Sequence, residues 1–261
     1  MNNQNELVYR KLQASLYDSN YKSKNYDLES EFILNIINNY NKCDVGTLNL
    51  LDIGCGTGTH ISHLSQYFAK LVGIDTSPDM ISLACQKYKN LKNTDFLCTN
   101  VDNLKNKFPL NHFDVVTLMY SVSGYLGPMA NFISKIKILS SIISENAILI
   151  FDYWDLESLN FEYEISRQKI LQFGNLEYKK ISVGKINYSS AFVDSHISWE
   201  EIGSETKWSE THRVYCYRNT ELIHQLEQLN FKVIVDAQDG KMDTPIIDNK
   251  SRWLIAVKSA T

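Results

Sequence analysis

Residues 48–60, LNLLDIGCGTGTH, constrain the fold of this chain more than any other stretch. The apolar half predicts a short buried strand, which ends abruptly in Gly54, Gly56 and Gly58 before a helix. Glycine lets the backbone pass close to a ligand, because it has no Cβ atom. A buried strand that feeds a glycine-rich turn and a helix is typical of the ligand-binding entrance of an open α/β sheet.

Strands and helices alternate through the first part of the chain. Apolar spacing predicts a helix over 59–68, a strand over 71–75, and a helix over 78–89 with Ser77 as its N-cap. The other elements expected here are a helix over 29–40, strands over 95–98, 113–119 and 147–151, and a helix over 128–143. This alternation predicts a parallel sheet that binds ligands at the carboxyl ends of its strands.

The pattern changes in the second part of the chain. Apolar and polar residues alternate over 175–217, which predicts antiparallel strands. Thr220 is expected to cap a helix over 221–229, and a hairpin of strands 231–235 and 253–257 is expected to close the sheet. We therefore expect an α/β protein with a seven-stranded mixed sheet, helices on both faces and a small antiparallel β insertion.

The expected organisation has three parts. Residues 1–40 form an N-terminal helical lid, and 41–175 together with 218–261 form the ligand-binding domain. Residues 176–217 form the antiparallel insertion.

Charge and cysteine content exclude several classes of protein. A net charge of −4 argues against a nucleic-acid partner, which needs a basic face. No apolar run approaches the ~20 residues that span a bilayer, and the start of the chain has no signal-peptide pattern. The five cysteines form no CxxC pair, and His60 and His63 have no third ligand nearby in the sequence. We expect a cytoplasmic protein without a membrane partner, disulfides or a bound metal.

The glycine spacing narrows the class of ligand that this loop can bind. The loop reads GxGxG, whereas a dinucleotide site requires GxGxxG, and Thr59 stands where that third glycine would be. Asp75 ends the second strand, about 20 residues on, where a carboxylate can bind ribose hydroxyls. Asp75 alone would also suit a hydride-transferring NAD enzyme, which Thr59 disfavours.

Three segments in this order carry a resemblance to a known family: LLDIGCGTG, then GIDTSPDMI at 73–81, then FDVV at 113–116. Together they resemble the class I S-adenosylmethionine-dependent methyltransferases, which implies a Rossmann-like domain with S-adenosylmethionine as cofactor. In that family the glycine loop cradles the amino-acid part of the cofactor and the acid after the second strand binds its ribose. The cofactor-binding residues implied here are Tyr26, Gly54, Cys55, Gly56, Gly58, Asp75, Thr76, Met80, Asn100, Val101, Asp102, Met119 and Ser121.

The adenine contact departs from the family pattern. The family usually has an Asp after the third strand, and Asn100 stands at that position, followed by Val101. An Asn side chain can also accept a hydrogen bond from the adenine amine. Asp102 is the alternative partner.

Sequences outside these motifs resemble one branch of the family. YDSNYKSKNYDLES at 17–30 resembles the YDxxY…DYxxEA opening of the amino-sugar N-methyltransferases, with two residues fewer between Tyr21 and Tyr26. LMYSVSGYL at 118–126 and DYWDLESL at 152–159 resemble that group's MFSSIGY and EPWWFPE segments. KWSETHRVYCYRNTELIHQLEQLNFKV resembles its FSExHxxxLFxxxEYxxAFxxAGF stretch. The resemblance extends over nearly the whole chain.

This resemblance implies an acceptor site. Tyr21 and Tyr125 are expected as the catalytic pair that flanks the transferred methyl group and orients the acceptor amine. Tyr17, Asp152, Trp154, His196 and Arg252 are expected to bind the substrate, with Arg252 contacting its phosphates or nucleotide. Simpler interpretations remain open, because Tyr21 can pack the N-terminal helix and Arg252 can be a surface residue. His196 and His212 can be ordinary residues of the insertion.

The resulting prediction is an S-adenosylmethionine-dependent N-methyltransferase that acts on an amino group of a nucleotide-linked amino sugar or a related small metabolite. One alternative is an O-methyltransferase of a sugar or of another nucleotide-activated precursor of a surface polysaccharide, which needs a firmer base. Another is a non-catalytic cofactor-binding protein. The expected partners are a small-molecule substrate and, in a homodimer, a second copy of the chain.

Overall fold

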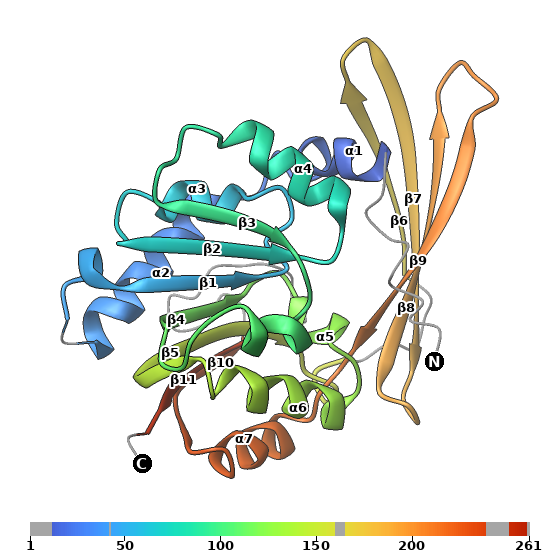
Figure 1. Ribbon diagram of the computed structural model, residues 1–261. Helices are drawn as coiled ribbons and strands as arrows, with labels where there is room; N and C mark the ends of the chain where they lie inside the picture. Colours follow the sequence, from blue (N-terminus) through green and yellow to red (C-terminus); the bar gives the residue numbers. More distant parts are fainter. Residues whose placement is uncertain (1–11, 42, 160–164, 239–250, 260–261) are drawn as a thin grey trace.

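The computed structural model describes residues 12–41, 43–159, 165–238 and 251–259, so residues 1–11 of the expected lid lie outside the described residues. Two separate β-sheets dominate it (Figure 1). One has seven strands with helices on both faces, and the other has four long strands at one side of it. The prediction of a seven-stranded sheet with an antiparallel insertion is confirmed.

The seven-stranded sheet has the order β10-β11-β5-β4-β1-β2-β3. Its parallel strands are β1 (Asn49–Ile53), β2 (Lys70–Asp75), β3 (Thr94–Cys98), β4 (Phe113–Leu118) and β5 (Ile143–Trp154). The strands β10 (Phe231–Gln238) and β11 (Ser251–Lys258) form the expected antiparallel hairpin beside β5. The carboxyl ends of β1, β2, β4 and β5 therefore meet at one edge, together with the start of β11.

Helices cover both faces of this sheet. On one face lie α2 (Tyr26–Tyr40), α3 (Thr59–Leu64) and α4 (Pro78–Lys87), and on the other lie η3 (Val101–Asn106), α6 (Met129–Leu139) and α7 (Asn219–Glu227). The helix α4 begins as predicted, because the Ser77 hydroxyl accepts a bond of 3.3 Å from the Met80 amide. A short 3-10 turn, η2 (Val45–Thr47), leads into β1.

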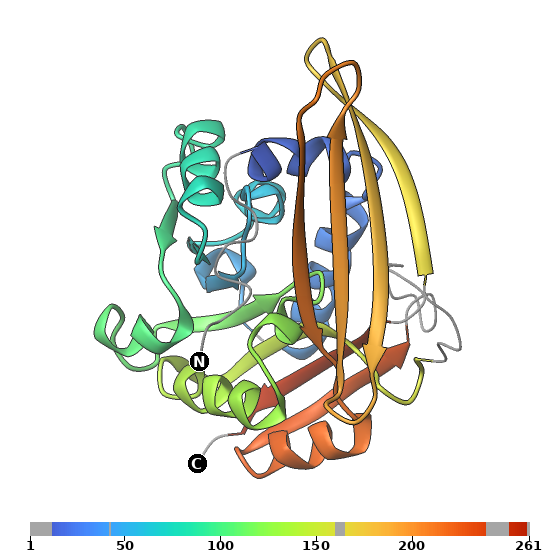
Figure 2. The same ribbon diagram turned by 90° about the vertical axis from the view of Figure 1, so that its right-hand side faces the viewer.

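The second sheet consists of β6 (Ile165–Phe173), β7 (Leu176–Asn187), β8 (Phe192–Glu201) and β9 (Lys207–Tyr215), each antiparallel to the next. The expected insertion at 176–217 omits β6, which pairs with β7 along its whole length. One face packs against α1 (Leu12–Asn20) through a buried cluster that contains Leu16, Leu171 and Trp199. Figure 2 shows the four strands in front of α1.

Several element predictions were wrong at their ends; the helix expected over 59–68, for example, ends at Leu64. The helix expected over 128–143 ends at Leu139, because the Ser140 and Ser141 hydroxyls bond back to carbonyls of the last turn and Ile143 already starts β5. The helix expected over 221–229, with Thr220 as its N-cap, runs over Asn219–Glu227 after Arg218 and has no side-chain cap. Apolar spacing did not predict the last residue of α6 or the first residue of α7. The residues at these positions are as compatible with a helix terminus as with the adjoining strand or turn.

Within residues 12–41, 43–159, 165–238 and 251–259, no helix is long and apolar enough to cross a membrane. No group of three His, Cys, Asp or Glu side chains in the same part of the chain is arranged to hold a metal ion.

Candidate active site

The glycine loop connects β1 to α3 with a left-handed backbone at Gly54, Gly56 and Gly58, whose φ angles are 69°, 55° and 82°. A Cβ atom at Gly54 would lie 2.6 Å from Val122 Cγ2, and one at Gly58 would lie 2.8 Å from the Phe96 ring. Neither position can therefore carry a side chain without displacing its neighbour.

Asp75 joins this loop to the next strand. Its carboxylate accepts hydrogen bonds from the Gly56 amide at 3.0 Å and from the Ser77 amide at 2.8 Å. Of the other residues expected on this side, Met80 is buried on α4 and Thr76 is exposed. Cys55 is buried, and burial raises the pKa of its thiol well above the usual value.

The residues expected at the adenine position follow β3. Val101 is buried, whereas Asn100 and Asp102 are exposed. The Asp102 carboxylate forms an ion pair with Lys135 on α6. The Asp102 carboxylate is therefore engaged by a neighbouring helix. Asn100, at the end of β3, remains the residue expected at the adenine.

The helix α1 covers the glycine loop. The Asp18 carboxylate accepts a bond of 2.6 Å from the Thr57 hydroxyl and one of 2.8 Å from Lys87 on α4. The Tyr17 ring lies 3.8 Å from the position that a Cβ atom of Gly56 would take. Through these contacts α1 lies directly over the glycine loop.

Aromatic rings gather between α1 and the end of β4. The ring centre of Tyr21 lies 4.7 Å from that of Tyr17 and 4.9 Å from that of Tyr120. The Lys24 ammonium lies 4.2 Å from the centre of the Tyr120 ring and 4.7 Å from that of Tyr26. Burial raises the pKa values of Tyr17 and Tyr21, so both hydroxyls keep their protons at neutral pH. Lys24 and Tyr120 were missed by sequence analysis, although both lie within segments that carried the resemblance.

The chain turns sharply after β4. Tyr120 and Ser121 are consecutive residues with left-handed φ angles of 67° and 60°. The Ser121 amide and hydroxyl donate to one Asp152 carboxylate oxygen, at 2.7 and 3.0 Å. Asp152, expected to bind substrate, is buried and holds this turn in place. Met119, just before the turn, is also buried.

Tyr125 lies on the short helix α5 (Val122–Tyr125), which contacts the second sheet. Its hydroxyl lies 2.8 Å from Nδ1 of His212 on β9. His212 Nε2 lies 3.4 Å from Glu210 Oε1, a distance that permits an ion pair but lacks hydrogen-bond geometry. The same Glu210 oxygen accepts a bond of 3.2 Å from the Trp199 ring nitrogen.

A narrow cavity of about 20 Å³ lies between α1 and the inner face of the four-stranded sheet. It is lined by Gln13, Tyr17, Asn20, Tyr21, Lys180, Ile197, Trp199, Glu210 and His212. Burial lowers the pKa of Lys180 to about 8. The cavity thus combines aromatic rings with a carboxylate, an imidazole and an amine that burial makes easier to deprotonate.

Other residues expected to bind substrate lie elsewhere. His196 is exposed on the outer face of the four-stranded sheet and contacts the Thr211 hydroxyl at 3.1 Å. Arg252 lies at the start of β11, paired with Asp236 and 3.5 Å from the Asp155 carboxylate. Trp154 ends β5 and packs against a small cluster with Leu156. Tyr26, which was expected to bind the cofactor, packs edge-on against His60, with 4.9 Å between the ring centres.

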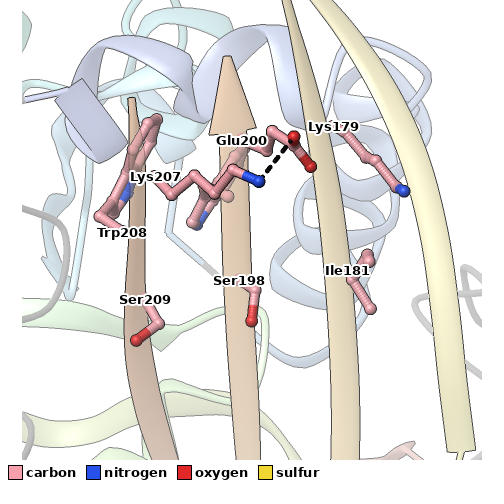
Figure 3. Close-up of a pocket in the computed structure, with 8 residues that line it drawn as sticks. Lys179, Ile181, Ser198, Glu200, Lys207, Trp208 and Ser209 are labelled. Atoms are coloured by element: carbon pink, nitrogen blue, oxygen red, sulfur yellow. Dashed lines mark ion pairs between the residues drawn. The ribbon is translucent and has the colours of Figure 1, made fainter. Parts of the chain in front are cut away.

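A second, shallow cavity of about 360 Å³ lies on the outer face of the same sheet (Figure 3). The side chains of Ile181, Ser198 and Ser209 project from that face, with helices behind the strands. Lys207 and Glu200 form an ion pair of 2.9 Å across it. The sheet separates this cavity from the tyrosines and the glycine loop, so we do not assign the chemistry to it.

Comparison with known proteins gives the class. Residues 50–137 match the family model described as a methyltransferase domain. The structure resembles Streptomyces venezuelae DesVI, with a TM-score of 0.78 and 16% identity over 96% of this chain and 100% of that one. It also resembles the sugar N-methyltransferase KedS8 from Streptoalloteichus, with a TM-score of 0.76 and 16% identity over 94% of this chain and 93% of that one. Residues 50–137 are therefore a methyltransferase domain, and the fold is that of the class I S-adenosylmethionine-dependent methyltransferases.

Two relatives with assigned reactions align with part of the chain. One is the dTDP-3-amino-3,6-dideoxy-alpha-D-glucopyranose N,N-dimethyltransferase of Streptomyces fradiae, 25% identical over 68% of this chain and 64% of its own length. The other is the dTDP-3-amino-3,4,6-trideoxy-alpha-D-glucopyranose N,N-dimethyltransferase of Streptomyces venezuelae, 24% identical over 56% of this chain and 59% of its own length. The alignments therefore span less than two thirds of either relative.

The residues of the loop fit S-adenosylmethionine. Gly56 has no atom nearer than the Tyr17 ring in its Cβ direction, which leaves its backbone open to a ligand. Asp52, at the end of β1, is buried, and its Oδ2 has no hydrogen-bond partner among the described residues. Burial raises the pKa of Asp52 to about 7, while a bond from the Thr117 hydroxyl opposes that shift. A carboxylate of this kind suits the cationic amino-acid end of the cofactor, and Asp75 suits its ribose.

Proposed function

We propose that this protein transfers a methyl group from S-adenosylmethionine to an amino group of a nucleotide-linked amino sugar. Two relatives with this type of substrate align with the chain. The structural resemblance to sugar N-methyltransferases covers the four-stranded sheet as well as the cofactor domain. The activity is proposed for the whole chain, because the sequence alignments cover only part of each relative.

The position of the tyrosine-lined cavity carries this proposal. Tyr17 lines this cavity and faces Gly56 of the cofactor loop, so an acceptor amino group in the cavity, whose volume of about 20 Å³ suits that group alone, would lie next to the donor. Methyl transfer is an in-line displacement, which depends mainly on alignment of the two reactants and exclusion of water. The rings of Tyr17 and Tyr21 can face a cationic sulfonium, and the Tyr125 hydroxyl can orient the acceptor nitrogen.

The remaining site residues are part of the same proposal. Tyr26, the glycine loop, Asp75 and its helix would hold the cofactor, with Asn100 and Val101 at its adenine. Asp152 would act through the turn at 120–121, and Trp154 and Arg252 would line the far end of the acceptor site. For Arg252 to bind a phosphate, its guanidinium must keep a free edge while it pairs with Asp236.

A methylation assay tests the proposed function. The purified protein would be incubated with S-adenosylmethionine and dTDP-3-amino-3,6-dideoxy-alpha-D-glucopyranose, and the product analysed by mass spectrometry. We expect the sugar nucleotide to gain one or two methyl groups, and the matched congener with a hydroxyl in place of the amine to gain none. Absence of product with every amino sugar in a panel would contradict the proposal.

The contact between Tyr125 and His212 favours a second candidate, an O-methyltransferase of a nucleotide-linked sugar. A sugar hydroxyl is a poor nucleophile until a base removes its proton, and a tyrosine hydroxyl backed by an imidazole can supply one. The same assay separates the candidates. Methylation of the hydroxyl congener but not of the amino sugar would identify the O-methyltransferase.

A further inference from the structure

A chain of three polar groups runs from the candidate acceptor site into the four-stranded sheet. The Tyr125 hydroxyl lies 2.8 Å from His212 Nδ1, and His212 Nε2 lies 3.4 Å from Glu210 Oε1. The side chains of His212 and Glu210 are only 4% and 8% exposed. A buried imidazole between a hydroxyl and a carboxylate is an arrangement by which proteins take a proton from a hydroxyl group.

We propose that Tyr125, His212 and Glu210 form a proton relay that takes the proton from the acceptor before methyl transfer. Tyr125 is the group that touches the acceptor, and His212 and Glu210 are positioning residues that act through it. The inference rests on the proposed function and deepens it, because it assigns the destination of the proton that the acceptor must lose.

The step balances in atoms and electrons. An acceptor ammonium gives one proton to the Tyr125 oxygen, while the proton of Tyr125 moves to Nδ1 of His212. The freed nitrogen lone pair forms the bond to the methyl carbon of the donor, whose carbon–sulfur bond breaks with its electron pair kept by sulfur. The acceptor thus exchanges a proton for a methyl group, and the imidazolium returns the proton to solvent when product leaves.

The surroundings of His212 favour this transfer. The titratable groups near it at the site are Glu210 on the same strand, Tyr125 on α5, Tyr17 on α1, Tyr21 just after α1, and Lys180 on β7. The Trp199 ring nitrogen fixes one Glu210 oxygen, and the other is buried with no hydrogen-bond partner among the described residues. A buried carboxylate with only one hydrogen-bonded oxygen stabilises a positive charge on the adjacent imidazole.

The pH dependence of turnover tests the relay. The relay removes the proton after the acceptor has bound. Without His212, therefore, only the fraction of acceptor that is already deprotonated in solution can react. We expect His212→Gln to lower kcat at neutral pH by about 100-fold. The kcat of this variant should rise again as the pH approaches the pKa of the free amine. Glu210→Gln should act in the same direction by a smaller factor. The matched controls, His224→Gln on α7 and Glu200→Gln on the outer face of β8, should keep the wild-type profile.

A second readout does not depend on turnover. Nitrogen NMR of His212 should show the ring proton on Nε2 in the wild-type protein, with Nδ1 as acceptor of the Tyr125 bond. Tyr125→Phe should shift the Nδ1 resonance, because that nitrogen loses its hydrogen-bond donor, while Glu210 keeps the proton on Nε2. An unchanged Nδ1 resonance, or a kcat loss that is equal at every pH, would contradict the relay. If the wild-type protein methylates none of the acceptors, the proposed function fails. If the wild-type protein methylates an acceptor and the His212 and Glu210 variants keep the wild-type pH profile, the proposed function stands and only the relay is contradicted.

Discussion

The turn after β4 is held in a conformation that its residues do not favour. Tyr120 and Ser121 both have positive φ angles, and neither is a glycine, so the turn stores strain that the surroundings must offset. Asp152 supplies two hydrogen bonds to Ser121, and the Ser123 hydroxyl donates to the Asp152 carbonyl at 2.7 Å. This arrangement aims the Tyr120 ring at Tyr21 and Lys24.

Gly54 of the glycine loop faces Val122, the residue that follows this turn. Gly54→Ala combines a left-handed backbone with a contact of 2.6 Å to Val122. We expect it to lower the free energy of unfolding by about 2–5 kcal/mol, as the sum of backbone strain and overpacking. Urea denaturation measures this change.

Gly203→Ala is the matched control, because Gly203 has a φ of 87° but no atom within 4 Å of its Cβ position. It should show the backbone cost alone, about 1–2 kcal/mol. Equal losses for the two variants would mean that the Val122 contact relaxes without cost.

The helices α2 and α3 are joined by a buried polar pair. The Glu29 carboxylate lies 2.5 Å from His60 Nε2 and 3.1 Å from the Lys24 ammonium. Burial lowers the pKa of His60. Burial by itself would raise the pKa of Glu29, but the bonds from His60 and Lys24 outweigh it and lower that pKa. Both shifts have the same consequence for stability, because in each case the unfolded chain binds protons more readily than the folded protein.

Acidification should therefore destabilise this pair of helices. The contribution of His60 is present above its ordinary pKa of 6.5 and is lost as pH falls below it, and that of Glu29 is lost further below 4.5. We expect the urea midpoint to fall between pH 7.5 and pH 5.5, by less in His60→Gln than in the wild type. His63→Gln is the control, since its partner Asp27 is largely exposed. A wild-type slope retained in His60→Gln would contradict this assignment.

At the scale of the whole molecule, the two sheets meet at α5. Tyr217, just after β9, donates to the carbonyls of Ser123 and Gly127 at 2.8 and 2.7 Å. The cofactor loop belongs to one sheet and the cavity to the other, so the acceptor site depends on how closely they pack.

Gly124 lies at the closest point of this junction. A Cβ atom there would lie 2.5 Å from Val214 and 2.8 Å from the Tyr215 carbonyl oxygen. Gly124→Ala should therefore push the sheets apart and lower kcat/KM for the acceptor by about tenfold or more, since a small misplacement of reactants is costly. Affinity for S-adenosylmethionine, measured by calorimetry, should change less than threefold. An equal loss of cofactor affinity would show that the junction supports the cofactor loop as well.

The glycine loop and its contact with Asp75 were predictable because the information that places them is local. A strand, three glycines and a terminal Asp75 lie within one βαβ unit, and their spacing alone predicts where the loop and the acid meet. The class of protein followed from the same segments. The ends of α6 and the start of β5 were not predictable, since apolar residues there suit either structure.

The acceptor half depended on tertiary structure. In a strand a shift of one residue reverses the face, so sequence alternation did not separate His196 from His212. The pairing of Ser195 with His212 turns His212 inward beside Tyr125 and His196 outward to solvent. Likewise, only the packing of α1 against the four-stranded sheet brings Tyr21 near Lys180. The sequence by itself determined the glycine loop and its acid, because both are encoded by short-range spacing. Strand register and the packing of distant segments decided which side chains line the cavity between α1 and the four-stranded sheet.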